Sequence, residues 1–96
     1  MFKKERMDIS REEIRKALDM AYGSYIEQEG KKCDSWKDQN FGQLGNHIRH
    51  EIEEVMGNIR RNEIGYLVHN AMDIIELGAI LLAKANLYLE KGKEGE

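Results

Sequence analysis

Apolar residues recur at steps of three and four along three segments of this chain, and no proline interrupts any of them. This spacing places apolar side chains on one face of an α-helix. In the first segment the positions are Ile14, Leu18, Ala21, Tyr22, Tyr25 and Ile26. Ser10 and Glu13 have the spacing of a capping box at a helix start, and Gly30 marks a break. The pattern predicts a first helix over about residues 10–29.

Two further helices follow from the same periodicity. The second, over about residues 42–61, carries an apolar stripe at Leu44, Ile48, Ile52, Val55 and Ile59. The third covers about residues 62–90, and Asn62 is the residue type that caps a helix start. Its apolar positions continue for many turns, so it is predicted to be the longest helix.

The chain is predicted to form one all-α domain over residues 1–96, since 41% hydrophobic residues suffice for one modest core. Residues 30–39 form a polar connection that contains Trp36, and the charged tail 91–96 is expected to fray. From Ile74 onward the third helix is apolar on almost all sides. Three helices of one chain cannot enclose it, so we expect a symmetric dimer that forms a four-helix bundle.

The net charge and the single cysteine limit the binding partners and the cellular compartments that we expect for this chain. The net charge of -3 lacks the basic excess that nucleic-acid binding favours. A single cysteine, Cys33, requires no oxidising compartment, and residues 1–7 do not resemble a secretory signal, so a cytoplasmic location is expected. The most apolar stretch, residues 71–89, contains four polar residues. These are Asp73, Glu76, Lys84 and Asn86. They favour a buried helix over a membrane span.

Acidic and amide side chains border the apolar faces of the second and third helices. At 100° per residue, a narrow stripe on the second helix holds four polar residues. They are His47, Glu51, Glu54 and Asn58. Glu53 points away from this stripe and is expected to be solvated. On the third helix, Asn70 and Asp73 lie one turn apart at a similar edge.

An antiparallel hairpin would bring these two sets together. Pairing Glu51 with Asp73, and Glu54 with Asn70, centres the hairpin on Asn62, where the capping signal also places the break. Carboxylates gathered at one enclosed place repel each other unless a cation lies among them. Hard oxygen ligands suit Mg²⁺ or Mn²⁺, and Mg²⁺ leaves positions for substrate phosphates. Arginines nearby could instead neutralise the carboxylates in a purely structural network.

Three segments resemble the MazG-like, all-α nucleoside triphosphate pyrophosphohydrolases. They are residues 36–39 (WKDQ), 47–55 (HIRHEIEEV) and 70–75 (NAMDII). The signature of that family is E-x-x-E, a spacer, and then E-x-x-D. Here fifteen residues separate Glu54 from Asn70, and the family's second glutamate is replaced by Asn70. The similarity covers residues 36–86, about half of the chain.

The resemblance implies the fold of the all-α nucleoside triphosphate pyrophosphatases, a dimer or dimer of dimers, and a nucleoside triphosphate substrate. It implies that Glu51, Glu54 and Asp73 bind Mg²⁺, with Asn70 at the fourth position, and that water attacks the α-phosphorus. The products are a nucleoside monophosphate and pyrophosphate. Glu54 is the expected catalytic residue that orients or deprotonates the water.

Three further residues are candidates for substrate binding. Trp36 could stack on the base or close over the core, and His50 could contact phosphate or lie on the surface. Lys84 could reach phosphates across a dimer or remain an ordinary exposed lysine.

Other functions remain open. A zinc site from His47, His50 and Glu54 lacks the H-E-x-x-H arrangement, and no Glu-x-x-His pairs support a di-iron bundle. The main alternative to the hydrolase is a non-catalytic helical dimerisation or interaction protein that has lost full metal binding through Asn70.

Overall fold

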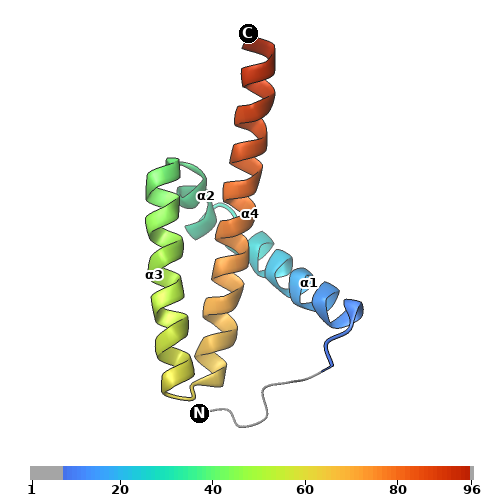
Figure 1. The fold of residues 1–96 in the computed structure, drawn as a ribbon, viewed down its shortest axis with the longest axis vertical. Coiled ribbons are helices and arrows are strands. Elements are labelled where there is room, and N and C mark those ends of the chain that lie inside the picture. The colour runs from blue at the N-terminus through green and yellow to red at the C-terminus, as the bar shows by residue number, and fades with distance from the viewer. Residues whose placement is uncertain (1–7, 96) are drawn as a thin grey trace.

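The computed structural model describes residues 8–95, without the side chains of 32–34 and 93–95 (Figure 1). Within this range the chain forms helices and no strand, so the all-α prediction is confirmed. The four helices are α1 (Arg11–Gln28), α2 (Lys32–Lys37), α3 (Phe41–Arg60) and α4 (Ile64–Gly95). Residues 1–7, for which the sequence predicts no secretory signal, lie outside the described range.

The helix starts follow from local hydrogen bonds. Ser10 caps α1, because its Oγ accepts a bond from the Glu13 backbone N–H at 3.1 Å. Asn40 and Gln43 form a reciprocal capping box at the start of α3, with bonds of 2.8 and 2.9 Å. This box places the start of α3 at Phe41, close to the predicted residue 42. Both caps satisfy backbone donors that have no partner within their helix.

Two local predictions differ from the structure. Residues 30–39 are not a plain loop, because the short helix α2 lies within them and carries Trp36. Asn62 does not cap the last helix; it takes a left-handed turn conformation, with φ of 56°, and α4 begins at Ile64. An asparagine tolerates this backbone conformation better than most residues do. The tight turn thus delays α4 by two residues.

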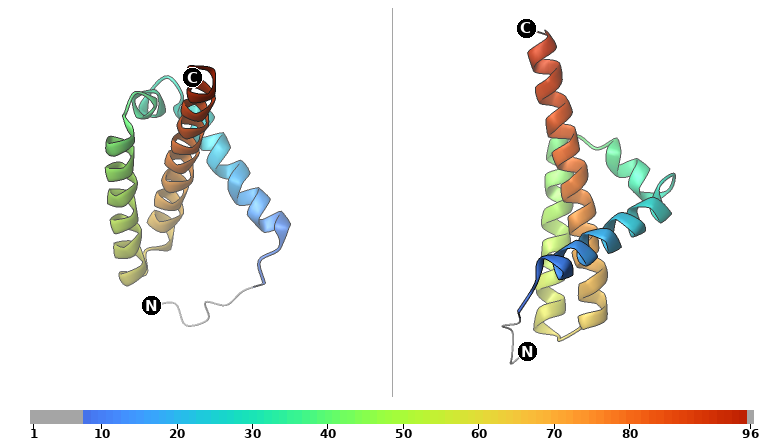
Figure 2. Two further views of the ribbon diagram at one scale, coloured as in Figure 1. Left: turned by 45° about the horizontal axis from the view of Figure 1, so that its top comes forward. Right: turned by 90° about the vertical axis from the view of Figure 1, so that its right-hand side faces the viewer.

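Helices α3 and α4 pack side by side as an antiparallel hairpin, and α1 crosses α4 on the side away from α3 (Figures 1 and 2). Helix α2 links α1 to the start of α3 (Figure 2). Trp36 from α2, Leu44 from α3 and Leu77 from α4 form the buried core. Tyr25, Ile48, Ile80 and Leu81 pack around it. The core therefore lies where α2, α3, α4 and the C-terminal half of α1 meet.

Helix α4 is much longer than its neighbour α3 and projects beyond the hairpin (Figure 1). The tail that was expected to fray is helical as far as Gly95. Leu82, Leu87 and Leu89 are exposed on the C-terminal half of α4. By length and composition alone, Ile64–Gly92 is also apolar enough to cross a membrane, with a mean hydropathy of 1.4. Core helices of soluble proteins share these properties and are mostly buried, whereas only 11% of this apolar window is buried within the single chain. The buried helix expected from the sequence is therefore not what the single chain forms.

Candidate functional site

A network of polar side chains joins α3 and α4 near the turn that connects them. Asn70 on α4 donates its Nδ2 to Oδ1 of Asn58 on α3 at 2.7 Å, and Asn58 is almost fully buried. Asn58 Nδ2 in turn donates to Oε1 of Glu63 at 3.1 Å. Arg61 Nε approaches the same oxygen at 3.0 Å. The amide of Asn70 is therefore part of a hydrogen-bonded link between the two helices.

The predicted hairpin placed Asn70 level with Glu54. In the structure the Asn70 side chain bonds to Asn58, which lies four residues, about one helical turn, further along α3. The amide nitrogen of Asn70 is therefore engaged with Asn58.

Glu51 lies in the interior of the hairpin, with only 8% of its surface exposed. Its Oε1 is 3.7 Å from Nε2 of His47, one turn earlier on α3. The His47 ring meets the Trp36 ring edge to face, with centroids 5.0 Å apart. Trp36 is itself buried among core residues, so its ring closes over the core, the second of the two roles considered for it. A carboxylate buried in this setting is expensive and is usually retained for a specific reason.

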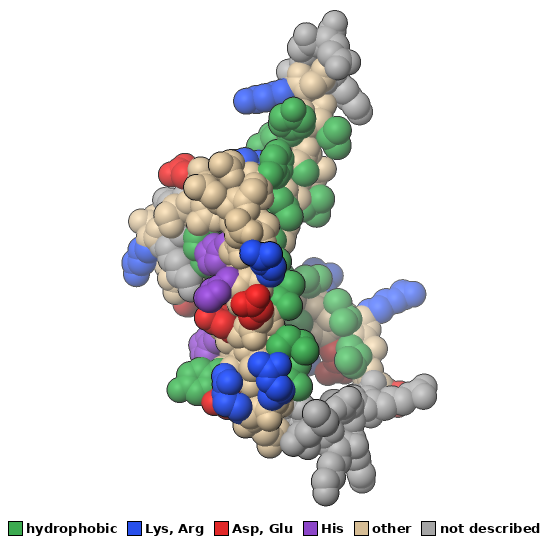
Figure 3. Space-filling model, turned by 60° about the vertical axis from the view of Figure 1, so that its left-hand side comes forward, with side chains coloured by type: hydrophobic (Ala, Val, Ile, Leu, Met, Phe, Trp, Pro, Cys, Tyr) green, Lys and Arg blue, Asp and Glu red, His purple; other side chains and the backbone are tan. Residues whose placement is uncertain are grey.

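Glu54 and His50 lie on the outer surface of α3. His50 Nε2 is 3.3 Å from Glu54 Oε1, and both side chains are well exposed. Figure 3 shows histidine and acidic side chains gathered on this face of the molecule. An exposed pair of this kind contributes little to stability because water screens it. Glu54 and His50 are thus well exposed, whereas Glu51 is largely buried.

The first half of α4 carries two acidic residues, Asp73, which is half-buried, and Glu76, which is only 3% exposed. Sequence reasoning treated Glu76 only as a polar interruption of an apolar stretch. The signal that could have singled it out is its spacing, because Asp73-x-x-Glu76 repeats the three-residue step of Glu51-x-x-Glu54. Each long helix therefore carries one buried carboxylate, Glu51 on α3 and Glu76 on α4.

In the part of the chain that the structure describes, the possible donor side chains do not form a complete metal site. Among the described residues, no group of three or more His, Cys, Asp or Glu side chains could hold a metal ion. A cage built by the protein alone therefore does not fit this arrangement. Mg²⁺ commonly uses only one or two carboxylates and completes its shell with water and substrate phosphates. The carboxylates of Glu51 and Asp73 are chemically suitable for that smaller role.

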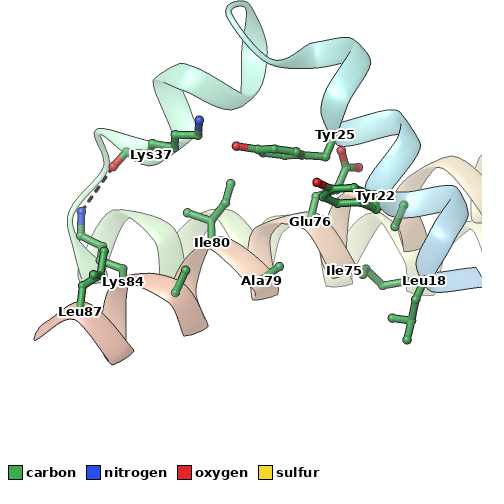
Figure 4. A pocket seen from close by; sticks show the side chains of 12 residues that line it. Leu18, Tyr22, Tyr25, Lys37, Ile75, Glu76, Ala79, Ile80, Lys84 and Leu87 are labelled. Atoms are coloured by element: carbon green, nitrogen blue, oxygen red, sulfur yellow. Dashed lines mark hydrogen bonds between the residues drawn. The ribbon is translucent and has the colours of Figure 1, made fainter. Parts of the chain in front are cut away.

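A groove runs between α1, α2 and the middle of α4, residues 75–87, with a volume of about 550 Å³ (Figure 4). Its walls are mostly apolar, and they include Leu18, Tyr22, Ile75, Ile80 and Leu87. Glu76 lies within it (Figure 4). The apolar periodicity predicted that Tyr22 and Tyr25 of α1 pack against other helices. Periodicity alone could not show that the face of α1 that bears them borders an open groove.

Polar groups close one end of the groove. Lys84 Nζ donates to the backbone oxygen of Lys37 at 3.4 Å (Figure 4). Lys37 Nζ is 3.0 Å from Oε2 of Glu29 and lies over the Tyr25 ring, 5.4 Å from its centroid. Lys84 is therefore engaged within its own chain, at the edge of an apolar channel.

Comparison with protein-family models, with curated proteins and with solved structures finds no match to this chain.

The Glu63 network makes the hairpin sensitive to acid. The hydrogen bond from Asn58, and then the bond and charge of Arg61, hold the pKa of Glu63 below its ordinary value. A lowered folded-state pKa stabilises the fold above the unfolded-state pKa, and this contribution is lost as pH falls through the folded pKa. We expect Glu63→Gln to remove part of the stability loss that occurs below the usual carboxyl range, roughly pH 4.

Chemical denaturation at a series of pH values measures this effect. The matched control is Glu53→Gln, because Glu53 is exposed on the same hairpin. Parallel curves for wild type and Glu63→Gln throughout the acid range would show that Glu63 carries no such contribution.

Proposed function

We propose that this chain is a Mg²⁺-dependent nucleoside triphosphate pyrophosphohydrolase with a MazG-like fold, assembled as a dimeric four-helix bundle. The observation that carries the proposal is the buried Glu51 within the α3–α4 hairpin, whose other helix bears Asp73. Maintaining a carboxylate in that interior costs stability, so a function for it is favoured. The spacing of the acidic residues and the hairpin supply the remaining support.

In this proposal the residues have distinct tasks. Glu51 and Asp73 hold Mg²⁺ together with the phosphates of the substrate, and His47 fixes the orientation of Glu51. When bound, the ion stabilises negative charge that develops on the phosphate oxygens. Glu54 is accessible on the surface of α3, and it accepts a proton from the attacking water. The water oxygen bonds to the α-phosphorus, and pyrophosphate leaves.

A panel of ribo- and deoxyribonucleoside triphosphates, each with Mg²⁺ or Mn²⁺, tests this function. We expect pyrophosphate release from at least one nucleotide, and we expect Glu51→Gln to abolish it while the helical circular dichroism signal is retained. Glu53→Gln is the control, because it removes a carboxylate from the exposed face of the same helix. No release from any nucleotide with either metal would contradict the proposal.

One observation favours a second candidate, a non-catalytic helical dimerisation or interaction protein. Asn70 occupies the position of a family glutamate, and its amide bonds to Asn58. For such a protein Glu51 has no ligand to bind, so Glu51→Gln should leave activity at background and raise the thermal midpoint. A clear loss of stability in that variant would count against the second candidate.

A further inference from the structure

The chain exposes more surface than a compact protein of its size. Its accessible surface is 7793 Å², whereas a folded monomer of 11.2 kDa exposes about 5,700 Å². Its radius of gyration is 15.7 Å, against about 12.5 Å for a compact chain of this length. The excess of roughly 2,000 Å² is of the size that each chain buries in a large permanent interface.

Much of the exposed surface of α1 and α4 is apolar. Among the described residues, the buried apolar side chains are Ala21, Trp36, Leu44 and Leu77. Many large apolar side chains stay exposed on the two helices that line the groove. They include Ile14, Leu18, Tyr22, Leu82, Leu87, Tyr88 and Leu89. Exposed apolar surface of this extent favours an interaction site.

Helix α4 lines one wall of the groove, and its C-terminal part is a segment that could occupy the same groove on another chain. Its 32 residues extend over about 48 Å, while the 20 residues of α3 cover only about 30 Å, so the last turns of α4 project beyond the hairpin. Tyr88 contacts the Phe41 ring at the first turn of α3, with centroids 6.0 Å apart, and the residues after it have no part of α3 beside them. Exposed Leu89 belongs to this projecting part.

We infer that the groove beneath α1 and α2 receives the C-terminal part of α4, residues 82–92, from a second copy of this chain. The inference rests on the proposed homodimer and adds which surface and which segment form it. A two-fold axis beside Ala83 makes the contact reciprocal, because each chain offers the same groove and the same segment. The partner's Leu87 then lies level with Ala79, where small side chains at 79 and 83 allow the helices to approach closely.

Sedimentation at several micromolar concentrations of the full chain tests the assignment. We expect a wild-type dimer. Ala83→Trp fills the groove, and Leu89→Glu places a charge on the segment that enters it. Because Ala83 and Leu89 are both exposed in the single chain, neither change should disturb its own fold. Each should raise the dimer dissociation constant by about tenfold or more.

Met56→Glu is the matched control, since Met56 is 49% exposed but lies on α3, outside the groove. A dimer that survives Met56→Glu and is weakened by the other two changes supports the assignment. A dimer lost in Met56→Glu but intact in Ala83→Trp and Leu89→Glu would overturn this surface while leaving the homodimer. A monomeric wild type would overturn the homodimer itself, and flotation of the wild type with phosphatidylcholine vesicles would show that lipid covers the apolar face instead.

Discussion

Replacing Leu77 with alanine should lower the free energy of unfolding by about 3 kcal/mol, because it opens a cavity at the centre of the core. Leu77 has no exposed surface and packs with Trp36 and Leu44, each from a different helix. A chain of 96 residues has a total stability of only about 5–14 kcal/mol. A large fraction of that stability should therefore disappear, and the thermal midpoint should fall by more than about 10 °C.

Thermal and urea unfolding at one fixed protein concentration measure this loss, since self-association makes stability depend on concentration. Val68→Ala is the matched control, because Val68 is 42% exposed on the same helix. We expect that control to cost well under about 1 kcal/mol. Equal losses in the two variants would mean that the cluster around Leu77 is not the centre of stability.

The second large effect concerns Asn70. Changing Asn70 to aspartate replaces the Nδ2 donor with an oxygen that faces Oδ1 of Asn58, an acceptor 2.7 Å away in the native hairpin. The hydrogen bond is lost and two acceptors are forced together beside a buried amide. We expect the free energy of unfolding to fall by about 2 kcal/mol, the usual cost of leaving a buried polar group without its partner.

Urea unfolding of Asn70→Asp without added metal is the direct measurement. Asn46→Asp is the control, because Asn46 accepts a bond from Arg49 on the surface and an aspartate can still accept it. Repeating the urea unfolding with Mg²⁺ shows whether the ion stabilises the Asn70→Asp variant. If Asn70→Asp is as stable as wild type in metal-free buffer, then the Asn58 bond does not hold the hairpin.

Much of the fold could be predicted because the helices are long and their apolar positions are regular. The spacing of Leu44, Ile48 and Ile52 indicates α3 without any tertiary information, and Ser10 indicates the start of α1. Helix α2 could not be found in this way, because six residues are too few to show a period. Its formation depends on Trp36 reaching the core, which is a tertiary contact.

The site was only partly predictable, because its geometry depends on angles of a few tens of degrees. Glu51 and Asn58 are seven residues apart and differ by about 20° around α3, and both are buried. Glu54 differs from Glu51 by about 60°, which is enough to place it in solvent. The turn of the hairpin contains one left-handed residue, Asn62, which the sequence allows but does not require.

Only a small share of α1 is buried, so this helix is held less firmly than the α3–α4 hairpin. Ala21 is its buried residue, while Ile14 and Leu18 lie in solvent near its outer end. An element with so few buried residues is expected to open at a lower energetic cost than the hairpin. Such an opening would pivot around Gly30, whose φ of 84° few other residues would tolerate.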